Sequence, residues 1–306
     1  MTTVSKAMHG RVAVLTVDNP PVNALSHSVR EGLANQMTAL AGDDGVDAIV
    51  IACAGRTFIA GADIREFGAP PKEPHLPDVV NQIEAMEKPV VAAIHGTALG
   101  GGLEVALSCH YRVAVESAKI GLPEVHLGIL PGAGGTQRLP RIAGPANAID
   151  AILSGRHVKA REALKWGVID EITDGDLVEA AIATAEKAVG KPPRRTGEIE
   201  IDGDAFGPEF FAGVRKSVAK QTRGYFAPER CIQCVEVAVS LPLAEGLKRE
   251  RELFQECAKN PQAKALQHMF FADRQVSRST GRASMSARRP TTGPGRPPSS
   301  TPTTPV

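Results

Sequence analysis

The sequence predicts an α/β domain that is followed by an all-helical segment and a disordered tail. Three observations carry this prediction. Short β-branched runs alternate with helix-spaced apolar residues over the first part of the 306-residue chain, helical stretches opened by proline follow, and a Ser/Thr/Pro-rich run ends the chain. Strands that alternate with helices are typical of layered α/β domains. The length leaves room for about two domains of roughly 150 residues each.

The first part of the chain contains short apolar runs that predict buried strands at 11–17, 47–53, 90–94 and 111–115. Between the first two runs, residues 28–41 carry apolar side chains at helical spacing, and Gly42 supplies a stop signal. Residues 145–190 are predicted to be largely helical apart from a brief strand at 168–172. These elements make 1–190 the first predicted domain.

A polar, glycine-containing stretch at 191–206 is predicted to be a linker, and a helical region spans 207–274. Proline opens its helices, which are expected at 208–220, 228–240, 243–259 and 261–274. The last segment, 275–306, holds 12 Ser or Thr, six Pro and five Arg but no acidic residue. Such a composition cannot build a core, so this tail is predicted to be disordered.

Charge and composition exclude several classes of protein. With 35 Lys and Arg against 34 Asp and Glu, the chain lacks the clustered positive charge of a nucleic-acid or membrane-surface binder. No run approaches the roughly 18 apolar residues of a transmembrane helix, and the N-terminus lacks a signal-peptide pattern. Five cysteines without a disulfide-like spacing fit reduced thiols. We therefore expect no nucleic-acid partner, no membrane and a cytoplasmic location.

Two small-residue clusters mark candidate binding loops, at 60–64 (AGADI) and 100–102 (GGG). The second cluster stands between a predicted strand and a predicted helix. A glycine run in that position exposes backbone N–H groups at a helix N-terminus, where they suit a developing negative oxygen. Either cluster alone is also explained by a tight turn.

Two glutamates are candidates for acid–base chemistry. Glu104 is expected in the first turn of the helix that the glycines open, between apolar neighbours, and Glu124 follows 20 residues later. A chain return of that length can bring both carboxylates to one cleft. Burial raises the pKa of a carboxyl group, which suits proton transfer near neutral pH. The alternative for a lone glutamate is a solvated surface charge.

Taken together, the motifs resemble those of the enoyl-CoA hydratase/isomerase (crotonase) superfamily. They are AIHGTALGGGLE at 93–104, LPE at 122–124 and LPGAGGTQRLPR at 130–141, with NPPVNAL at 19–25 and AGADI at 60–64 in the expected places. The resemblance implies the crotonase (ClpP-like) fold of stacked ββα units over 1–190. It also implies a lyase that reversibly hydrates trans-2-enoyl-CoA to 3-hydroxyacyl-CoA in fatty-acid β-oxidation.

The resemblance assigns roles to individual residues. Glu104 would activate the water and Glu124 would protonate the α-carbon, while the backbone N–H groups of Ala60 and Gly101 would form an oxyanion hole. Substrate-binding roles are implied for Val22, Ala24, Gly61, Ala62, Asp63 and Ile64. The presence of both glutamates favours hydration, with a side isomerase activity that needs one acid–base group.

Three further segments resemble the multifunctional β-oxidation enzymes, in which a hydratase half is joined to an NAD-dependent 3-hydroxyacyl-CoA dehydrogenase half. They are 109–113, 245–254 and 261–274. No G-x-G-x-x-G motif occurs in the chain, so the dehydrogenase half is expected to be missing and no NAD or other cofactor is expected. No His, Cys and Asp set has metal-ligand spacing, so no metal is expected.

Two alternative functions stay open at this stage. One is a 3-enoyl-CoA to 2-enoyl-CoA isomerase or another crotonase-fold enzyme of coenzyme A thioesters, because one fold supports several chemistries. The other is an inactive, truncated remnant that binds coenzyme A. The expected partner is an acyl-CoA substrate. Both a homo-oligomer (trimer or hexamer) and a monomer are compatible with the resemblance.

Overall fold

The computed structural model describes residues 3–66 and 70–279, without the side chains of Ile64 and 274–279. It divides into two units, Met1–Leu266 and Gln267–Val306. The predicted tail begins inside an observed helix, because α11 (Pro261–Ser279) continues past 274. The rest of the predicted tail, 280–306, lies outside the described residues.

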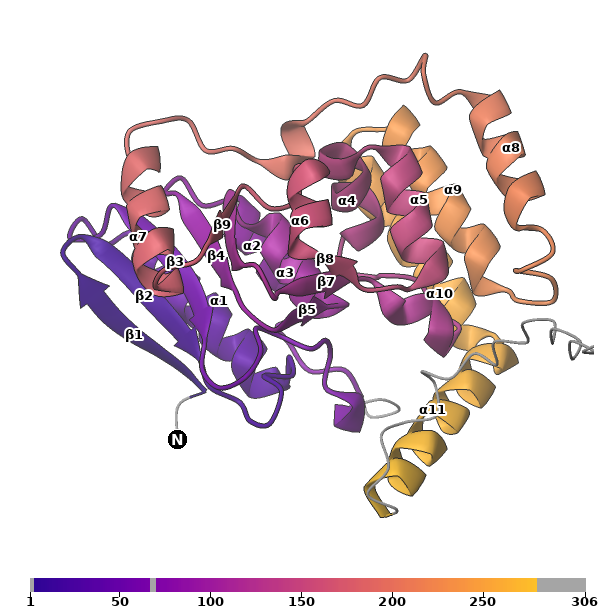
Figure 1. The fold of residues 1–306 in the computed structure, drawn as a ribbon, viewed down its shortest axis with the longest axis horizontal. Helices are drawn as coiled ribbons and strands as arrows, with labels where there is room; N and C mark the ends of the chain where they lie inside the picture. The colour runs from indigo at the N-terminus through magenta and orange to yellow at the C-terminus, as the bar shows by residue number, and fades with distance from the viewer. Residues whose placement is uncertain (1–2, 67–69, 280–306) are drawn as a thin grey trace, which may run out of the picture. The chain divides into compact units, whose positions relative to one another are not determined.

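The first unit contains a six-stranded sheet (Figure 1). Its spatial order is β1–β2–β3–β4–β6–β9; β1 runs antiparallel to β2, and the other neighbours are parallel. The strands are β1 (Val4–His9), β2 (Val12–Val17), β3 (Ala48–Cys53), β4 (Val90–Ile94), β6 (Tyr111–Val115) and β9 (Glu171–Thr173). The four long strands predicted from the sequence are confirmed to within one residue.

Both faces of this sheet are covered. Val14 and Val50 point to one face and pack with Ile182 of α7 (Leu177–Ala188), which Figure 1 shows lying against the sheet. The intervening side chains, such as Leu15 and Ile51, join a larger core on the other face. A parallel sheet that is buried on both faces reads as a continuous apolar run, which is why these strands were visible in the sequence.

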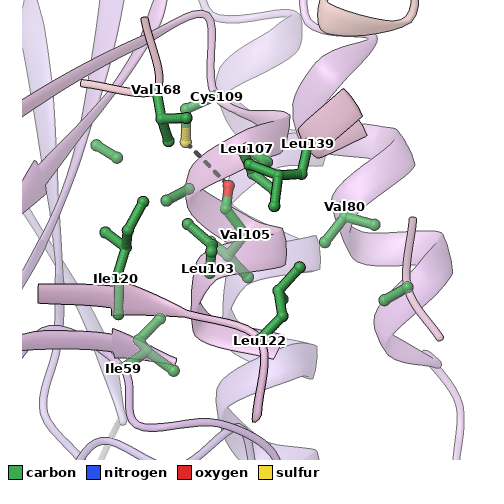
Figure 2. Close-up of a cluster of buried hydrophobic side chains, with 14 of the residues drawn as sticks. Ile59, Val80, Leu103, Val105, Leu107, Cys109, Ile120, Leu122, Leu139 and Val168 are labelled. Carbon is green, nitrogen blue, oxygen red and sulfur yellow. Dashed lines mark hydrogen bonds between the residues drawn. The ribbon is translucent and has the colours of Figure 1, made fainter. Parts of the chain in front are cut away.

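A smaller sheet lies beside the helix that the glycine run at 100–102 opens. It contains β5 (Thr97–Leu99), β7 (Lys119–Gly121) and β8 (Val158–Lys159) in the order β5–β7–β8. The helix that follows β5, α3 (Gly101–Ser108), is buried along its whole length. Figure 2 shows its apolar side chains surrounded by those of the small sheet, the loops and neighbouring helices. The Cys109 thiol donates to the carbonyl oxygen of Val105 at 3.3 Å.

The remaining helical elements are α1 (His27–Ala41), α2 (Leu76–Glu84), α4 (Gly135–Ala143), α5 (Pro145–Ser154), α6 (Ala160–Lys165), α8 (Pro208–Val218), α9 (Ala227–Ser240) and α10 (Leu243–Lys259), with 3-10 turns η1 (Ile64–Glu66), η2 (Pro123–Leu127) and η3 (Thr196–Glu198). None of the described helices is long and apolar enough to cross a membrane.

The predicted boundary at 190 does not separate two compact units. Helix α9 packs against α4 and α5, and α10 packs against α4 and α9, so the helical region shares one unit with the α/β elements. The predicted linker 191–206 is anchored as well. The Thr196 hydroxyl donates to the carbonyl oxygen of Leu107 at 2.9 Å, and the Gly197 amide donates to Oε1 of Glu84 at 2.8 Å.

Candidate active site

The glycine run at 100–102 fixes how closely α3 approaches the AGADI segment. Gly100 precedes the helix with a φ of 53°, a conformation that favours glycine. A Cβ on Gly102 would overlap the carbonyl oxygen of Ile59. The first turn of α3 therefore packs directly on the backbone before residue 60, and only hydrogen fits between them.

The backbone amides of these two segments differ in whether they have a hydrogen-bond partner. The Ala60 N–H donates to the carbonyl oxygen of Val22 at 3.1 Å, so it is already paired. The Ala62 amide nitrogen lies 3.9 Å from where a Cβ on Gly101 would stand. Within the described residues, neither the Ala62 nor the Gly101 N–H donates a hydrogen bond. The predicted donor Ala60 is thus already paired, whereas the N–H groups of Ala62 and of the other predicted donor, Gly101, are unpaired among the described residues.

The predicted substrate-binding residues on the two loops lie side by side. The Leu25 amide donates to the carbonyl oxygen of Gly61 at 2.9 Å, and the Ala60–Val22 bond ties the other end of the pair. These bonds bring Val22, Ala24, Gly61 and Ala62 into one short paired segment. The side chain of Ile64, which was also predicted to bind substrate, lies outside the described part of the chain.

Asp63 is buried and paired with a side chain that the sequence analysis did not single out. Its carboxylate accepts hydrogen bonds from the guanidinium of Arg65, with a shortest N–O distance of 2.6 Å. The hydrogen bond from Arg65 lowers the pKa of Asp63. Asp63 therefore holds the exposed guanidinium of Arg65 in place. The only signal in the sequence was that Arg65 follows the AGADI motif.

Glu104 is held by two backbone amides. It lies in the first turn of α3 and is buried. Its Oε1 accepts hydrogen bonds from the amides of Ala133 and Gly135 at 2.7 and 2.9 Å. Burial raises the pKa of Glu104, while these two bonds and the nearby charge of Arg138 oppose the rise. Hydrogen bonds to one oxygen fix the carboxylate and leave its second oxygen for a ligand.

Glu124 lies in η2 next to Glu104. A Cβ on Gly100 would stand 2.8 Å from Oε1 of Glu124, so the glycine makes room for this carboxyl group. The other oxygen, Oε2, is buried and has no hydrogen-bond partner among the described residues. Burial, followed by the charge of Glu104, raises the pKa of Glu124 well above its ordinary value. The two glutamates predicted from the sequence are thus brought together in one buried cluster.

A third carboxylate, Glu250 of α10, completes the cluster and was missed. Its Oε1 accepts from the Gly134 amide at 2.7 Å, and its Oε2 accepts from the amide of Thr136 at 3.2 Å and from the Thr136 hydroxyl. Burial, followed by the charge of Glu104, raises the pKa of Glu250 to about 8. Three acidic groups from three distant parts of the chain therefore share one desolvated region.

In the sequence, the neighbours of Glu250 are charged residues. It stands in the run KRERE at 248–252, which is typical of a solvated helix face. Its spacing from Gly246, Leu253 and Cys257 gives the better signal, because these residues form the buried stripe of α10. A glutamate in such a stripe indicates a buried carboxylate with specific partners.

The raised pKa of Glu250 predicts a pH-dependent stability. The folded chain keeps this proton up to about pH 8, whereas the ordinary pKa is 4.5. The contribution of this bound proton to the free energy of unfolding is therefore complete below about pH 4.5 and is lost as pH rises to about 8. The melting temperature of wild type should fall relative to that of Glu250→Gln between pH 5 and pH 8. Thermal unfolding followed by circular dichroism checks this, and a constant difference between the two proteins would contradict it.

Among the described residues, no group of three or more His, Cys, Asp and Glu side chains has the arrangement of a metal site. In the acidic cluster, Glu104 and Glu250 instead accept hydrogen bonds from backbone amides. What the arrangement offers chemically is two carboxyl groups with raised pKa beside two unpaired backbone N–H groups.

Known proteins match this chain over most of its length. Residues 7–199 match the family model described as enoyl-CoA hydratase/isomerase. The chain is 48% identical over 271 residues to the peroxisomal bifunctional enzyme of Danio rerio, covering 88% of this chain and 38% of that protein. It is 36% identical over 296 residues to the fatty acid oxidation complex subunit alpha of Shewanella loihica, covering 90% of this chain and 42% of that protein. The chain thus spans about two-fifths of the curated relatives it matches.

Solved structures of enoyl-CoA hydratases are similar to this chain in fold. An enoyl-CoA hydratase from Bacillus anthracis superposes with a TM-score of 0.58 at 27% identity, covering 92% of this chain and 98% of that one. An enoyl-CoA hydratase/isomerase from Pseudoalteromonas atlantica superposes with a TM-score of 0.65 at 26% identity, covering 93% and 100%. The predicted crotonase fold is confirmed by these neighbours.

Proposed function

The chain belongs to the enoyl-CoA hydratase/isomerase family, and on that premise we propose that it reversibly hydrates trans-2-enoyl-CoA to 3-hydroxyacyl-CoA in fatty-acid β-oxidation. The observation that carries the proposal is the adjacent pair of Glu104, which is buried, and Glu124, whose Oε2 is buried, beside the unpaired amides of Ala62 and Gly101. The relatives named as bifunctional and fatty-acid-oxidation enzymes support the same substrate class.

The two amides are suited to the thioester oxygen. When water adds to the β-carbon of the enoyl group, negative charge moves to that oxygen. Donors at Ala62 and Gly101 are already fixed by the packing of α3 on the AGADI segment, so they need no rearrangement as charge develops. One such donor typically contributes about 2.7–4 kcal/mol to the transition state.

The two carboxyl groups divide the proton work. Hydrogen bonds from two amides favour the ionised form of Glu104, whereas Glu124 lacks such donors on Oε2 and its pKa is raised well above the ordinary value. Two adjacent like charges disfavour double ionisation, so the shared proton resides on Glu124. Glu104 then takes a proton from the water that attacks the β-carbon, and Glu124 gives its proton to the α-carbon.

This division favours hydration over isomerisation. Moving a double bond needs one acid–base group, and Glu124 alone would suffice. Glu104 is fixed through one oxygen and lies close enough for its charge to raise the pKa of Glu124, so one water could contact both carboxyl groups.

We also propose that the chain acts as a monomer, because α9 and α10 of the same chain already pack around α4 and Glu250 reaches the acidic cluster from within it. Light scattering after size-exclusion chromatography tests this proposal, and a trimeric or hexameric mass would contradict it. The cytoplasmic location stays a prediction. Relatives named as peroxisomal favour a different compartment, and microscopy of the tagged full chain distinguishes the two.

Turnover of crotonyl-CoA tests the proposed function. The purified chain should lower the absorbance of the conjugated thioester to its equilibrium value and form 3-hydroxybutyryl-CoA. Denatured protein is the control. Binding of crotonyl-CoA, detected by calorimetry, without loss of the absorbance band would support the alternative of a coenzyme A-binding remnant and contradict the proposal.

A further inference from the structure

We propose that Glu250 is a positioning residue of this active site, which holds the turn at 133–136 in the conformation that fixes Glu104. The inference rests on the proposed function for its kinetic part. It assigns an active-site role to a helix that lies after residue 199, where the match to the family model ends.

The backbone N–H groups of the 133–136 turn donate hydrogen bonds to two different carboxyl groups. The first and third N–H groups donate to Glu104 at 2.7 and 2.9 Å. The second and fourth N–H groups donate to Glu250 at 2.7 and 3.2 Å. Successive amides thus alternate between two carboxylates, and neither carboxylate can shift without changing the peptide planes that hold the other.

The position of Glu250 is costly for stability alone. Glu250 is 2% exposed and its carboxyl group lies near the charge of Glu104, while Arg138 is a nearby cation. A buried ionisable group beside a like charge is generally less stabilising than an apolar residue of similar volume. An apolar side chain could fill the space, so the use of a carboxyl group, whose oxygens face the donors of the turn, indicates a demand for hydrogen-bond acceptors.

Further hydrogen bonds connect the 133–136 turn to the helices that follow in the chain. The Thr136 hydroxyl donates to Oε2 of Glu250. The side-chain amide of Gln137 then donates to Thr136 Oγ1 at 3.2 Å and to the carbonyl oxygen of Cys234 in α9 at 2.8 Å. The turn before α4 is therefore tied to α10 and α9 together, which gives Glu104 a rigid support.

Glu250 hydrogen-bonds to the turn and to no predicted substrate-binding residue among those described. Its loss should therefore lower kcat and leave KM for crotonyl-CoA nearly unchanged. In Glu250→Gln, an NH₂ group, which cannot accept a hydrogen bond, replaces an oxygen of the carboxyl group and faces the donors of the turn. We expect kcat to fall by about 10- to 100-fold, since a small misplacement of a catalytic group costs up to about 10²-fold, with KM changed less than about threefold.

A matched set of variants separates positioning from folding. Glu252→Gln changes an exposed glutamate of the same helix and should leave both constants at wild-type values. Thr136→Val removes the hydroxyl bond to Glu250 together with the 3.2 Å bond from Gln137, and leaves the backbone bonds of the turn in place. It should lower kcat in the same direction but less, so it decides the question if Glu250→Gln does not fold. Circular dichroism well below the melting temperature verifies that each variant is folded.

A double-variant cycle tests whether Glu250 acts through Glu104. Residues that act as a unit are not additive, so adding Glu250→Gln to Glu104→Gln should change kcat less than about threefold. Equal fold losses in both backgrounds, or wild-type kcat in folded Glu250→Gln and Thr136→Val, would overturn the proposal.

A readout without turnover keeps the inference separate from the proposed function. The amide proton resonances of Ala133 and Gly135 report their bonds to Glu104. They should shift in Glu250→Gln, although neither amide contacts Glu250, and stay unchanged in Glu252→Gln. Unchanged resonances in the first variant would overturn the inference even if crotonyl-CoA is hydrated. A wild-type chain without turnover, in contrast, would refute only the proposed function.

Discussion

Glu124→Gln is expected to lower kcat for crotonyl-CoA hydration by about 10²- to 10⁴-fold, the usual contribution of a general acid. Its carboxyl is buried, with Oε2 unpaired among the described residues and its pKa raised well above the ordinary value by burial and by Glu104. In the proposed mechanism it carries the proton that the α-carbon receives. Glutamine has the same shape but cannot release a proton, so binding should survive. Steady-state kinetics with crotonyl-CoA measures both effects.

The same experiment includes Glu104→Gln, which should lose a similar factor because glutamine cannot take the proton of the attacking water. The matched control is Glu116→Gln, an exposed glutamate paired with Arg161 on the surface, which should retain wild-type kcat. Hydration should also slow as pH rises through the pKa of Glu124, since the proton-carrying form is the active one. A kcat near wild type in either active-site variant would refute the role of that residue.

Arg138→Met is expected to destabilise the fold by about 3–5 kcal/mol, the usual cost of leaving one partner of a buried ion pair alone. Arg138 is fully buried and its Nη2 lies 2.7 Å from Oε2 of Glu84 and 2.8 Å from Oδ1 of Asn81. It joins α4 to α2 beneath the acidic cluster. Chemical denaturation followed by circular dichroism measures the loss.

Two controls sharpen this stability test. Arg161→Met removes an exposed pair with Glu116 and should cost less than about 1 kcal/mol. Adding Glu84→Gln to Arg138→Met removes the unpaired charge and should recover part of the loss. Equal destabilisation by the buried and the exposed arginine variants would contradict the account of the Arg138–Glu84 pair.

The sequence was most informative where one local pattern carried the structure. Continuous apolar runs predicted the buried strands, and the glycine run predicted the start of α3. Strand β1 escaped because only its first residue is buried, so no apolar pattern marks it. Strands β5, β7 and β8 have three residues or fewer, which is too short for any periodicity to be read.

Within the site, the sequence analysis identified the loops that carry the unpaired amides, but it chose one amide, that of Ala60, which is already hydrogen-bonded. The spacing of Glu104 and Glu124 predicted their meeting, and the structure brings them together. The choice of Ala60 failed because its N–H pairs with Val22, and the positive φ of 109° at Gly61 turns the chain before Ala62. Such a change in amide direction leaves no trace in residue types. Glu250 required a contact across 114 residues to Thr136, which no local pattern contains.

The stereochemistry of hydration in D₂O tests the central claim most directly. If Glu124 delivers the proton from a fixed side, wild-type protein should convert crotonyl-CoA to 3-hydroxybutyryl-CoA with one deuterium on a single face of C2, resolved by proton NMR. Because both carboxyl groups lie together, oxygen and deuterium should add to the same face of the double bond. Deuterium on both faces of C2 would mean that solvent protonates a released enolate, and it would contradict the assignment of Glu104 and Glu124 to one concerted site.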